Sequence, residues 1–209
     1  MKNLGIAKIG YKYVILSGVL AAAFYLIFTP LFFVFIFITA FVAFFFRDPP
    51  RKSPQESNLV LAPADGKIMR VERTTEPDFI GGEALKISIF LSLFDVHINR
   101  APCRGNILYC QYIPGGNLPA YKDKALQNNE RNLIGIQSDQ GKVLVIQMAG
   151  IIARRIVCWI KKDDLVEAGA RIGMIKFGSC TEIYLPTHLN TKVKVGERVR
   201  GGETVLGEY

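Results

Sequence analysis

Histidine is scarce in this chain of 209 residues, which contains only His97 and His188. The sequence has no Cys-x-x-Cys pair, no glycine-rich phosphate-binding motif and no cluster of Asp, Glu and His. These absences exclude a zinc site built from paired cysteines and the common nucleotide-binding loops, so we expect no bound metal. The four scattered cysteines are typical of buried thiols in a reducing compartment, and Cys180 has no histidine beside it to activate it.

Charge is absent from residues 13–46, and all 18 acidic residues follow this segment. Because an uncharged run of this length exceeds what a core helix needs, we expect a membrane anchor over residues 1–46. Pro30 divides the run, which leaves two topologies: a helical hairpin that bends there, or one longer helix that is kinked there. Basic residues at both ends favour the hairpin, with the following domain on the cytoplasmic face of the cell membrane.

The residues after the anchor change in character. Residues 47–58 form a proline-rich linker that cannot continue a helix. Residues 47–209 contain 23 basic and 18 acidic residues, a net charge of +5, which suits either nucleic acid or an anionic membrane surface. No basic run is interleaved with aromatic residues, so we expect no nucleic-acid partner and favour membrane lipid.

Residues 59–209 alternate between apolar and polar residues in short segments, which predicts a mainly β domain with few short helices. Asp65-Gly66 predicts a hairpin between strands over 59–61 and 67–73. Asp139-Gln-Gly141 predicts a second hairpin between strands over 133–137 and 142–148.

The C-terminal third contains an internal repeat. The pattern Val166-x-x-Gly169-x-x-Ile172 recurs 33 residues later with Val199, Gly202 and Val205. Two such copies predict a small barrel or sandwich whose C-terminal half has the two-fold character of lipoyl-like domains.

Gly178 and Ser179 lie between the two copies, where alternating residues on both sides predict two strands that meet at a tight turn. A serine hydroxyl at this place can attack the preceding carbonyl and convert the amide to an ester. Elimination from the ester would leave an amino terminus that carries a ketone, a pyruvoyl group. Gly-Ser is also an ordinary turn dipeptide, so the choice between a simple turn and a cleavage site depends on the surrounding sequence.

Two further residues are candidates for chemistry. His97 lies beside Asp95, directly after an expected buried strand, where it is either structural or a general acid or base. Asp65 is by default a turn residue.

Six segments in chain order carry a resemblance to a known family. They are FFRDP (45–49), APADGK (62–67), FDVHINRAP (94–102), DKA (123–125) with NNERN (128–132), ARR (153–155) and KFGS (176–179). With these segments, the sequence resembles the short-form phosphatidylserine decarboxylase proenzymes from residue 44 to the C-terminus.

The resemblance implies self-cleavage between Gly178 and Ser179. The large subunit would be 1–178, and the small subunit 179–209 would begin with a pyruvoyl cofactor derived from Ser179. This ketone would form a Schiff base with the amine of phosphatidylserine and accept the electrons left by loss of CO2, giving phosphatidylethanolamine. The two subunits would stay together as a heterodimer or a larger assembly of it.

Residue roles follow from the same resemblance. Asp65 matches the aspartate of an Asp-His-Ser relay in long-form relatives, and His97 matches the first of two histidines there. Arg100 stands where the second histidine would be, so we expect His97 to act as the general acid/base for decarboxylation. The candidates for binding the lipid phosphate or the serine carboxylate are Lys122, Lys124, Arg131, Arg154 and Arg155, and ordinary surface charge is the alternative.

A non-enzymatic function is the competing hypothesis. A membrane-tethered lipoyl-like module would carry a prosthetic group or bind a partner through an exposed lysine at a hairpin tip. Lys176 is the nearest candidate, but it lacks the Met-Lys-Met setting of a carrier lysine.

Overall fold

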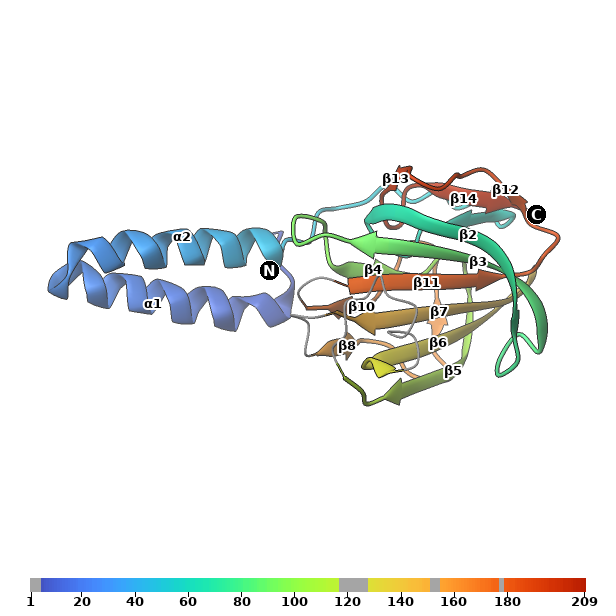
Figure 1. The fold of residues 1–209 in the computed structure, drawn as a ribbon, viewed down its shortest axis with the longest axis horizontal. Helices are drawn as coiled ribbons and strands as arrows, with labels where there is room; N and C mark the ends of the chain where they lie inside the picture. Colours follow the sequence, from blue (N-terminus) through green and yellow to red (C-terminus); the bar gives the residue numbers. More distant parts are fainter. Residues whose placement is uncertain (1–4, 117–127, 151–154, 177–178) are drawn as a thin grey trace. The chain divides into compact units, whose positions relative to one another are not determined.

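The computed structural model describes residues 5–116, 128–150, 155–176 and 179–209, with the backbone alone for Ser179. The chain divides into two compact units, with the boundary between Pro50 and Arg51. We refer to residues up to Pro50 as unit 1 and to Arg51–Tyr209 as unit 2. Each unit is described by itself (Figure 1).

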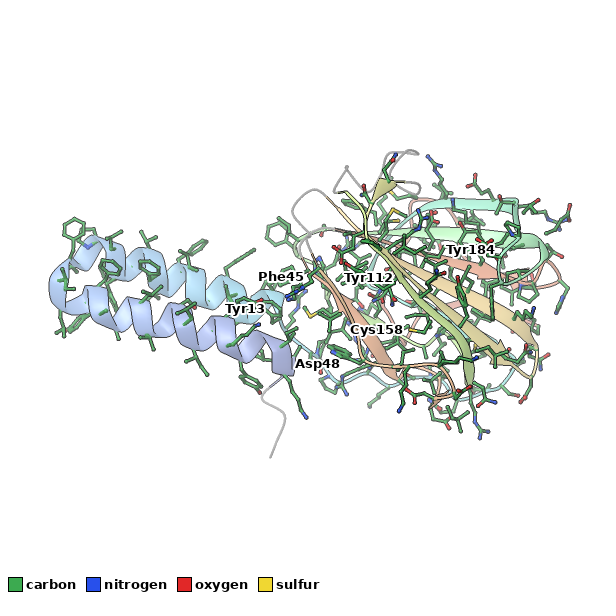
Figure 2. The ribbon with its side chains drawn as sticks, turned by 90° about the horizontal axis from the view of Figure 1, so that it is seen from below. Tyr13, Phe45, Asp48, Tyr112, Cys158 and Tyr184 are labelled. Carbon is green, nitrogen blue, oxygen red and sulfur yellow. The ribbon has the colours of Figure 1, made fainter. Side chains whose placement is uncertain are left out.

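Unit 1 contains a short 3-10 helix, η1 (Lys8–Gly10), followed by the α-helices α1 (Tyr11–Ile27) and α2 (Thr29–Phe45). Phe28 is extended, with φ −156°, and it separates the two helices. Aromatic rings then hold the helices against each other, as Phe24 stacks on Phe35 at 5.1 Å. Tyr13 and Phe45 are seen near the open end of this pair in Figure 2.

Both helices are apolar. In the described part of the chain, the helical stretch Lys8–Ile27 is long and apolar enough to cross a membrane, whereas Thr29–Phe45 is apolar but shorter. At 1.5 Å per residue α2 would reach about 26 Å, slightly less than a hydrocarbon core of ~30 Å. The function of unit 1 as a membrane anchor remains a prediction.

Unit 2 is built from β-strands, which confirms the mainly β prediction. The strands are β1 (Leu59–Leu61), β2 (Gly66–Glu76), β3 (Gly82–Leu91), β4 (Ile98–Arg100), β5 (Gly105–Ile113), β6 (Arg131–Ser138), β7 (Gly141–Ala149), β8 (Ile156–Cys158), β9 (Leu165–Val166), β10 (Arg171–Ile175), β11 (Ser179–Leu185), β12 (Asn190–Thr191), β13 (Arg198–Val199) and β14 (Val205–Glu208).

An eight-stranded antiparallel sheet dominates unit 2 and curls, with the order β13-β2-β3-β11-β7-β6-β5-β9. Two three-stranded sheets, β1-β14-β12 and β4-β10-β8, accompany it. Alternate residues of β11 face opposite sides of the large sheet. Ile183 and Leu185 join the main apolar core, whereas Tyr184 joins a second cluster with Phe79 and Leu144.

The hairpin expected at Asp65-Gly66 is not formed, so that prediction was wrong. Strand β1 pairs with β14 at the other end of the chain, and β2 pairs with β3 and β13. Gly66 instead allows the backbones of β2 and β3 to lie close together, because a Cβ at this position would lie 2.2 Å from the carbonyl oxygen of Phe90. The second predicted hairpin is confirmed, since β6 and β7 pair up to Ser138 and Gly141.

The internal repeat corresponds to repeated local structure. Gly169 and Gly202 have φ values of 78° and 77°. Their amides donate to the carbonyl oxygens of Ala101 and Ala62, both at 2.8 Å. The segments 62–68 (APADGKI) and 101–107 (APCRGNI) are the matching partners of the two copies. The two copies therefore share the same turn conformation and the same backbone hydrogen bond, while a lipoyl-like architecture with two-fold character remains a prediction.

Candidate functional site

The site forms at one end of unit 2, where β10 ends and β11 begins (Figure 1). Ser179 is the first residue of β11, and its backbone pairs with Leu91 of β3 and Ala149 of β7. Strands do flank the Gly-Ser dipeptide as predicted, but β10 and β11 belong to different sheets and do not pair as a hairpin. Gly178 lies outside the described residues.

His97 is fully buried directly before β4. Its Nδ1 lies 3.0 Å from the carbonyl oxygen of Asp95. Because a carbonyl oxygen only accepts hydrogen bonds, the hydrogen sits on Nδ1 and Nε2 is the basic nitrogen of the neutral ring. The arrangement therefore prepares Nε2 to take up a proton.

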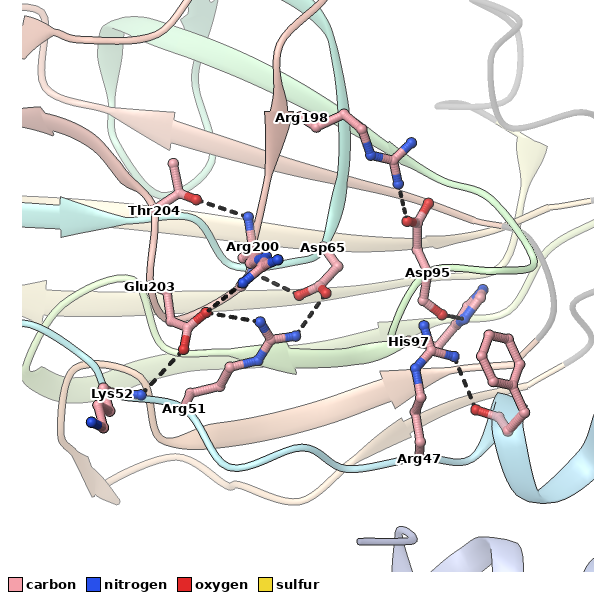
Figure 3. Close-up of polar contacts among 12 residues, drawn as sticks. Arg47, Arg51, Lys52, Asp65, Asp95, His97, Arg198, Arg200, Glu203 and Thr204 are labelled. Atoms are coloured by element: carbon pink, nitrogen blue, oxygen red, sulfur yellow. Dashed lines mark hydrogen bonds and ion pairs between the residues drawn. The ribbon is translucent and has the colours of Figure 1, made fainter.

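Contacts of the Asp95 side chain hold the carbonyl of this residue in place (Figure 3). The Oδ2 atom of Asp95 accepts from the backbone nitrogen and the hydroxyl of Ser92 at 2.8 and 2.7 Å. Its Oδ1 atom forms an ion pair with Arg198. The bonds to Asp95 thus set the position of the His97 ring.

Backbone register brings His97 to the same end as Ser179. The amide of Ile175, the last residue of β10, donates to the carbonyl of His97 at 3.1 Å. Only four residue steps separate Ile175 from Ser179, so these two residues lie within about 14 Å along the chain. His97 and the first residue of β11 therefore lie at the same end of unit 2.

Asp65 lies in a separate cluster of charges (Figure 3). Arg51 donates to Asp65 at 2.7 Å and to Glu203 at 3.0 Å, and the amide of Gly201 donates to Asp65 at 2.8 Å. Burial raises the pKa of Asp65, although Arg51 and the Gly201 amide act in the opposite direction. The carbonyl of Asp95, and not the carboxylate of Asp65, accepts the Nδ1 hydrogen of His97.

Arg100 differs from His97 in the direction it faces. Successive residues of a strand point to opposite faces, so Arg100 faces away from the side shared by His97 and Asn99. Its guanidinium donates to the carbonyl of Gly169 at 2.9 Å. This bond ties β4 to one copy of the internal repeat.

The predicted cationic residues have different surroundings. Arg155 is exposed at the Ser179 end, where its carbonyl accepts from the amide of Lys176 at 3.3 Å. Arg131 pairs with Met148, and Met148 pairs with Cys180, so Arg131 lies on the opposite face of the large sheet from position 179. The other three, Lys122, Lys124 and Arg154, lie outside the described residues.

Cys180 is buried, and burial raises the pKa of its thiol, which makes it a poor nucleophile. Within the described ranges, no group of three or more His, Cys, Asp or Glu side chains is positioned to hold a metal ion.

Sequence reasoning missed a set of buried polar side chains at this end. Asn99, Asn132, Gln147 and Thr181 are at most 1% exposed and are hydrogen-bonded to one another. The signal was present, because Gln147 interrupts the apolar run of β7. The hydrogen bonds among these side chains could not be predicted, because the four residues lie on four strands that become neighbours only in the folded chain.

Comparison with known proteins shows the family to which this chain belongs. A family model described as phosphatidylserine decarboxylase matches residues 38–207. The chain belongs to the phosphatidylserine decarboxylase family. It is 49% identical over 171 residues to a phosphatidylserine decarboxylase proenzyme of Symbiobacterium thermophilum, covering 81% of this chain and 80% of that protein. A proenzyme of the same name from Carboxydothermus hydrogenoformans is 47% identical over 199 residues, covering 95% and 93% of the two chains.

Membership of the phosphatidylserine decarboxylase family confirms the resemblance carried by the six sequence segments. It also establishes the chain as a decarboxylase. The matched range includes His97, Asp65 and the 178–179 dipeptide.

Proposed function

We propose that this chain is a membrane-attached, self-processing decarboxylase that converts phosphatidylserine to phosphatidylethanolamine and CO2. The cofactor is a pyruvoyl group made from Ser179. The observation that carries the proposal is that buried His97 and the first residue of β11 lie at the same end of unit 2. The names of the relatives, which are decarboxylase proenzymes, support both the reaction and a maturation step.

Self-processing begins when the hydroxyl of Ser179 adds to the carbonyl carbon of the preceding peptide bond. The C–N bond breaks as the C–O ester bond forms, and a proton passes from the hydroxyl to the nitrogen. Elimination then removes the Cα proton of Ser179 and releases the carboxylate of Gly178, after which uptake of water and loss of ammonia leave the ketone. His97 Nε2 suits these proton transfers because Nδ1 is committed as a donor.

The structure fits a terminus at residue 179, because β11 is paired on both sides. It runs between β3 and β7 in the middle of the large sheet, so a break before Ser179 would leave all of these pairings in place. Glu203 with Arg51, Arg198 with Asp95, and the pairing of β14 with β1 join the two pieces further. We therefore expect a stable heterodimer of 1–178 and 179–209.

During decarboxylation the pyruvoyl group supplies an electron sink for the pair left by departing CO2. The chain's own residues bind the substrate and move protons. His97 Nε2 returns a proton to the carbon that lost CO2. Arg155 is exposed at the same end and can bind the phosphate or the carboxylate of the headgroup. A guanidinium suits either group, because it can donate two parallel hydrogen bonds to two oxygens at once.

Membrane attachment places the enzyme at its substrate, since a two-chain lipid rarely leaves the bilayer. The apolar helices of unit 1 support an anchor, and lysines before α1 with arginines after α2 support a cytoplasmic site. The carrier hypothesis has less support, because Lys176 is only 7% exposed and a carrier lysine must reach other proteins.

Carboxyl-labelled phosphatidylserine in detergent micelles tests the function directly. We expect the full chain to release labelled CO2 and Ser179→Ala to release none. His97→Asn should lower the rate by at least about a hundredfold, as expected for loss of a general acid/base. An Arg155→Gln variant should raise KM without slowing self-cleavage. If His97→Asn both cleaves and decarboxylates at wild-type rates, the role of His97 is refuted.

A further inference from the structure

Two of the four cysteines form a pair of neighbouring thiols. Sγ of Cys110 lies 3.7 Å from Sγ of Cys158, although 48 positions separate the two residues in the chain. Both side chains are half-buried, whereas Cys103 and Cys180 are buried. The expectation of buried thiols was therefore wrong for this pair, which reagents in solution can reach (Cys158 is labelled in Figure 2).

The two thiols belong to strands of different sheets. Cys110 is on β5 of the large sheet and pairs with Ile134 of β6. Cys158 is on β8 of a three-stranded sheet and pairs with Gly173 of β10. Among the described strands, β5 and β8 do not pair with each other. A bond between the two sulfurs therefore joins the two sheets covalently.

Backbone hydrogen bonds fix the chain around both thiols. The amide of Ile107 on β5 donates to the carbonyl of Asp164 at 2.9 Å, and the carbonyl of Ile107 accepts from the amide of Asp163 at 2.8 Å. These bonds hold the segment after β8 against β5. The amide of Trp159 donates to the carbonyl of Ile172 at 3.0 Å, which holds the end of β8 on β10. The two sulfurs are therefore neighbours because the backbone places them together.

The distance between the sulfurs suits the formation of a disulfide. At 3.7 Å they are in contact, and a disulfide bond of about 2 Å requires that they approach by about 1.7 Å. Strand β8 can supply this shift, because it has three residues and lies at the edge of its sheet. The thiol of Cys158 donates to the carbonyl of Ile160 at 3.2 Å, and Sγ of Cys110 lies 3.9 Å from the same oxygen.

We propose that Cys110 and Cys158 form a reversible thiol–disulfide site, which takes a low-molecular-weight disulfide as its oxidant. In a reducing compartment the pair stays as two thiols, and it closes when the oxidant accumulates. The bridge fixes β8, which begins directly after Arg155, to the large sheet. The inference goes beyond the proposed function and does not depend on it, because both cysteines precede residue 178.

The closing reaction consists of two thiol–disulfide exchanges. The thiolate of Cys158 attacks one sulfur of the oxidant, so that a new S–S bond forms, the S–S bond of the oxidant breaks and one thiolate leaves. The thiolate of Cys110 then attacks the sulfur of Cys158 and expels the second thiolate. Two electrons pass from the pair to the oxidant, which leaves as two thiols with the two protons of the cysteines.

The surroundings of Cys110 favour this order of attack. Burial, and then the neighbouring Cys158, raise the pKa of the Cys110 thiol to about 12, which makes it a poor first nucleophile. In the mixed disulfide the sulfur of Cys158 bears no charge, so one of the causes that oppose ionisation of Cys110 is removed. Cys110 is therefore the second thiol to react.

The test treats the purified full chain, in detergent micelles and without urea, with oxidised glutathione at about pH 8. Digestion with trypsin under non-reducing conditions, followed by mass spectrometry, then shows which cysteines are joined. We expect the peptides 105–122 and 156–161, which contain Cys110 and Cys158, to be linked within one chain. Dithiothreitol should separate them again.

Two serine variants identify the part of each thiol. Cys110→Ser leaves Cys158 without its partner, so the mixed disulfide of Cys158 with glutathione should accumulate at least about tenfold above the wild type. In Cys158→Ser, Cys110 should take up glutathione at least about tenfold more slowly than Cys158 does in Cys110→Ser. Cys103→Ala removes a buried thiol outside the pair, so it is the matched control and should form the bridge normally.

Thiols that stay reduced in the wild type would overturn the proposal. Glutathione that remains on Cys158 equally in the wild type and in Cys110→Ser would overturn it as well, since Cys110 would then be out of reach. A link that forms only in urea, or only between two copies of the chain, would have the same consequence, because the sulfurs have to meet within one folded chain.

Discussion

The buried ion pair of Lys86 and Glu182 should stabilise the strand that begins at Ser179. Nζ of Lys86 lies 3.1 Å from Oε1 of Glu182, and the side chains are only 7% and 4% exposed. Glu182 also accepts from the hydroxyls of Ser88 and Tyr184, both at 3.0 Å. Burial and the neighbouring Glu182 raise the pKa of Tyr184, so its hydroxyl stays protonated and remains a donor.

Lys86→Met removes the only cation at hydrogen-bond distance from Glu182 among the described residues. Removing one partner of a buried pair costs about 3–5 kcal/mol, and the two remaining hydroxyl donors suggest the lower end, about 3 kcal/mol. In Lys86→Met/Glu182→Gln the buried charge is absent. The double variant should therefore recover to within about 1–2 kcal/mol of its parent.

Urea unfolding followed by Trp159 fluorescence measures these values. The proposed cleavage cannot occur in a Ser179→Ala background, so dissociation of fragments would not enter the free energy of unfolding. Lys192→Met is the control, because its ion pair with Glu208 spans 2.6 Å but the side chains are 45% and 35% exposed. It should cost less than about 1 kcal/mol, and a loss as small for Lys86→Met would refute the argument from burial.

Three further predictions concern the rest of unit 2. Gly173→Ala should lower the free energy of urea unfolding by about 1–3 kcal/mol, because its Cβ would lie 2.5 Å from the carbonyl oxygen of Val157; an unchanged value would contradict the tight contact. Burial raises the pKa of Cys103 to about 12, so at pH 8 it should react with iodoacetamide about a thousandfold more slowly than a free thiol, and the rate should rise with pH; labelling at the free-thiol rate, followed by mass spectrometry, would contradict this. Arg51→Met should lower the free energy of unfolding in the same urea assay by about 1–2 kcal/mol, because the hydrogen bonds of Arg51 to Asp65 and Glu203 are lost. An unchanged free energy of unfolding would show that this cluster of charges does not stabilise unit 2.

Local signals in the sequence predicted part of the fold well. The hairpin of β6 and β7 formed where Asp139-Gln-Gly141 indicated, because both strands are adjacent in the chain and their alternation is regular. The hairpin predicted at Asp65-Gly66 was wrong, because the strands on the two sides of this dipeptide do not pair with each other. The partner of β1 is β14 at the far end of the chain, and a turn signal carries no information about distant pairing.

The repeat was recognised from three matched positions, although a stronger signal was present. Segments 62–68 and 101–107 share an Ala-Pro start, a glycine and a final isoleucine, and each packs on one copy of the repeat. Comparison of these segments would have indicated from the sequence that the two copies form matching turns.

The site divides in a similar way. His97 and Ser179 were predicted as site residues from the sequence, because each lies in a short segment that resembles the family. The set of hydrogen-bonded polar side chains that includes Gln147 and Thr181 was not predicted, because its members come from four strands and matter only through their mutual distances.

Intact mass analysis of the purified protein, beside its Ser179→Ala variant, tests the central claim most directly. The account predicts two pieces that separate after residue 178, with the 179–209 piece lighter by one ammonia than its encoded sequence, and a single uncleaved chain for the variant. A preparation that decarboxylates phosphatidylserine while its mass shows one intact chain would contradict the account.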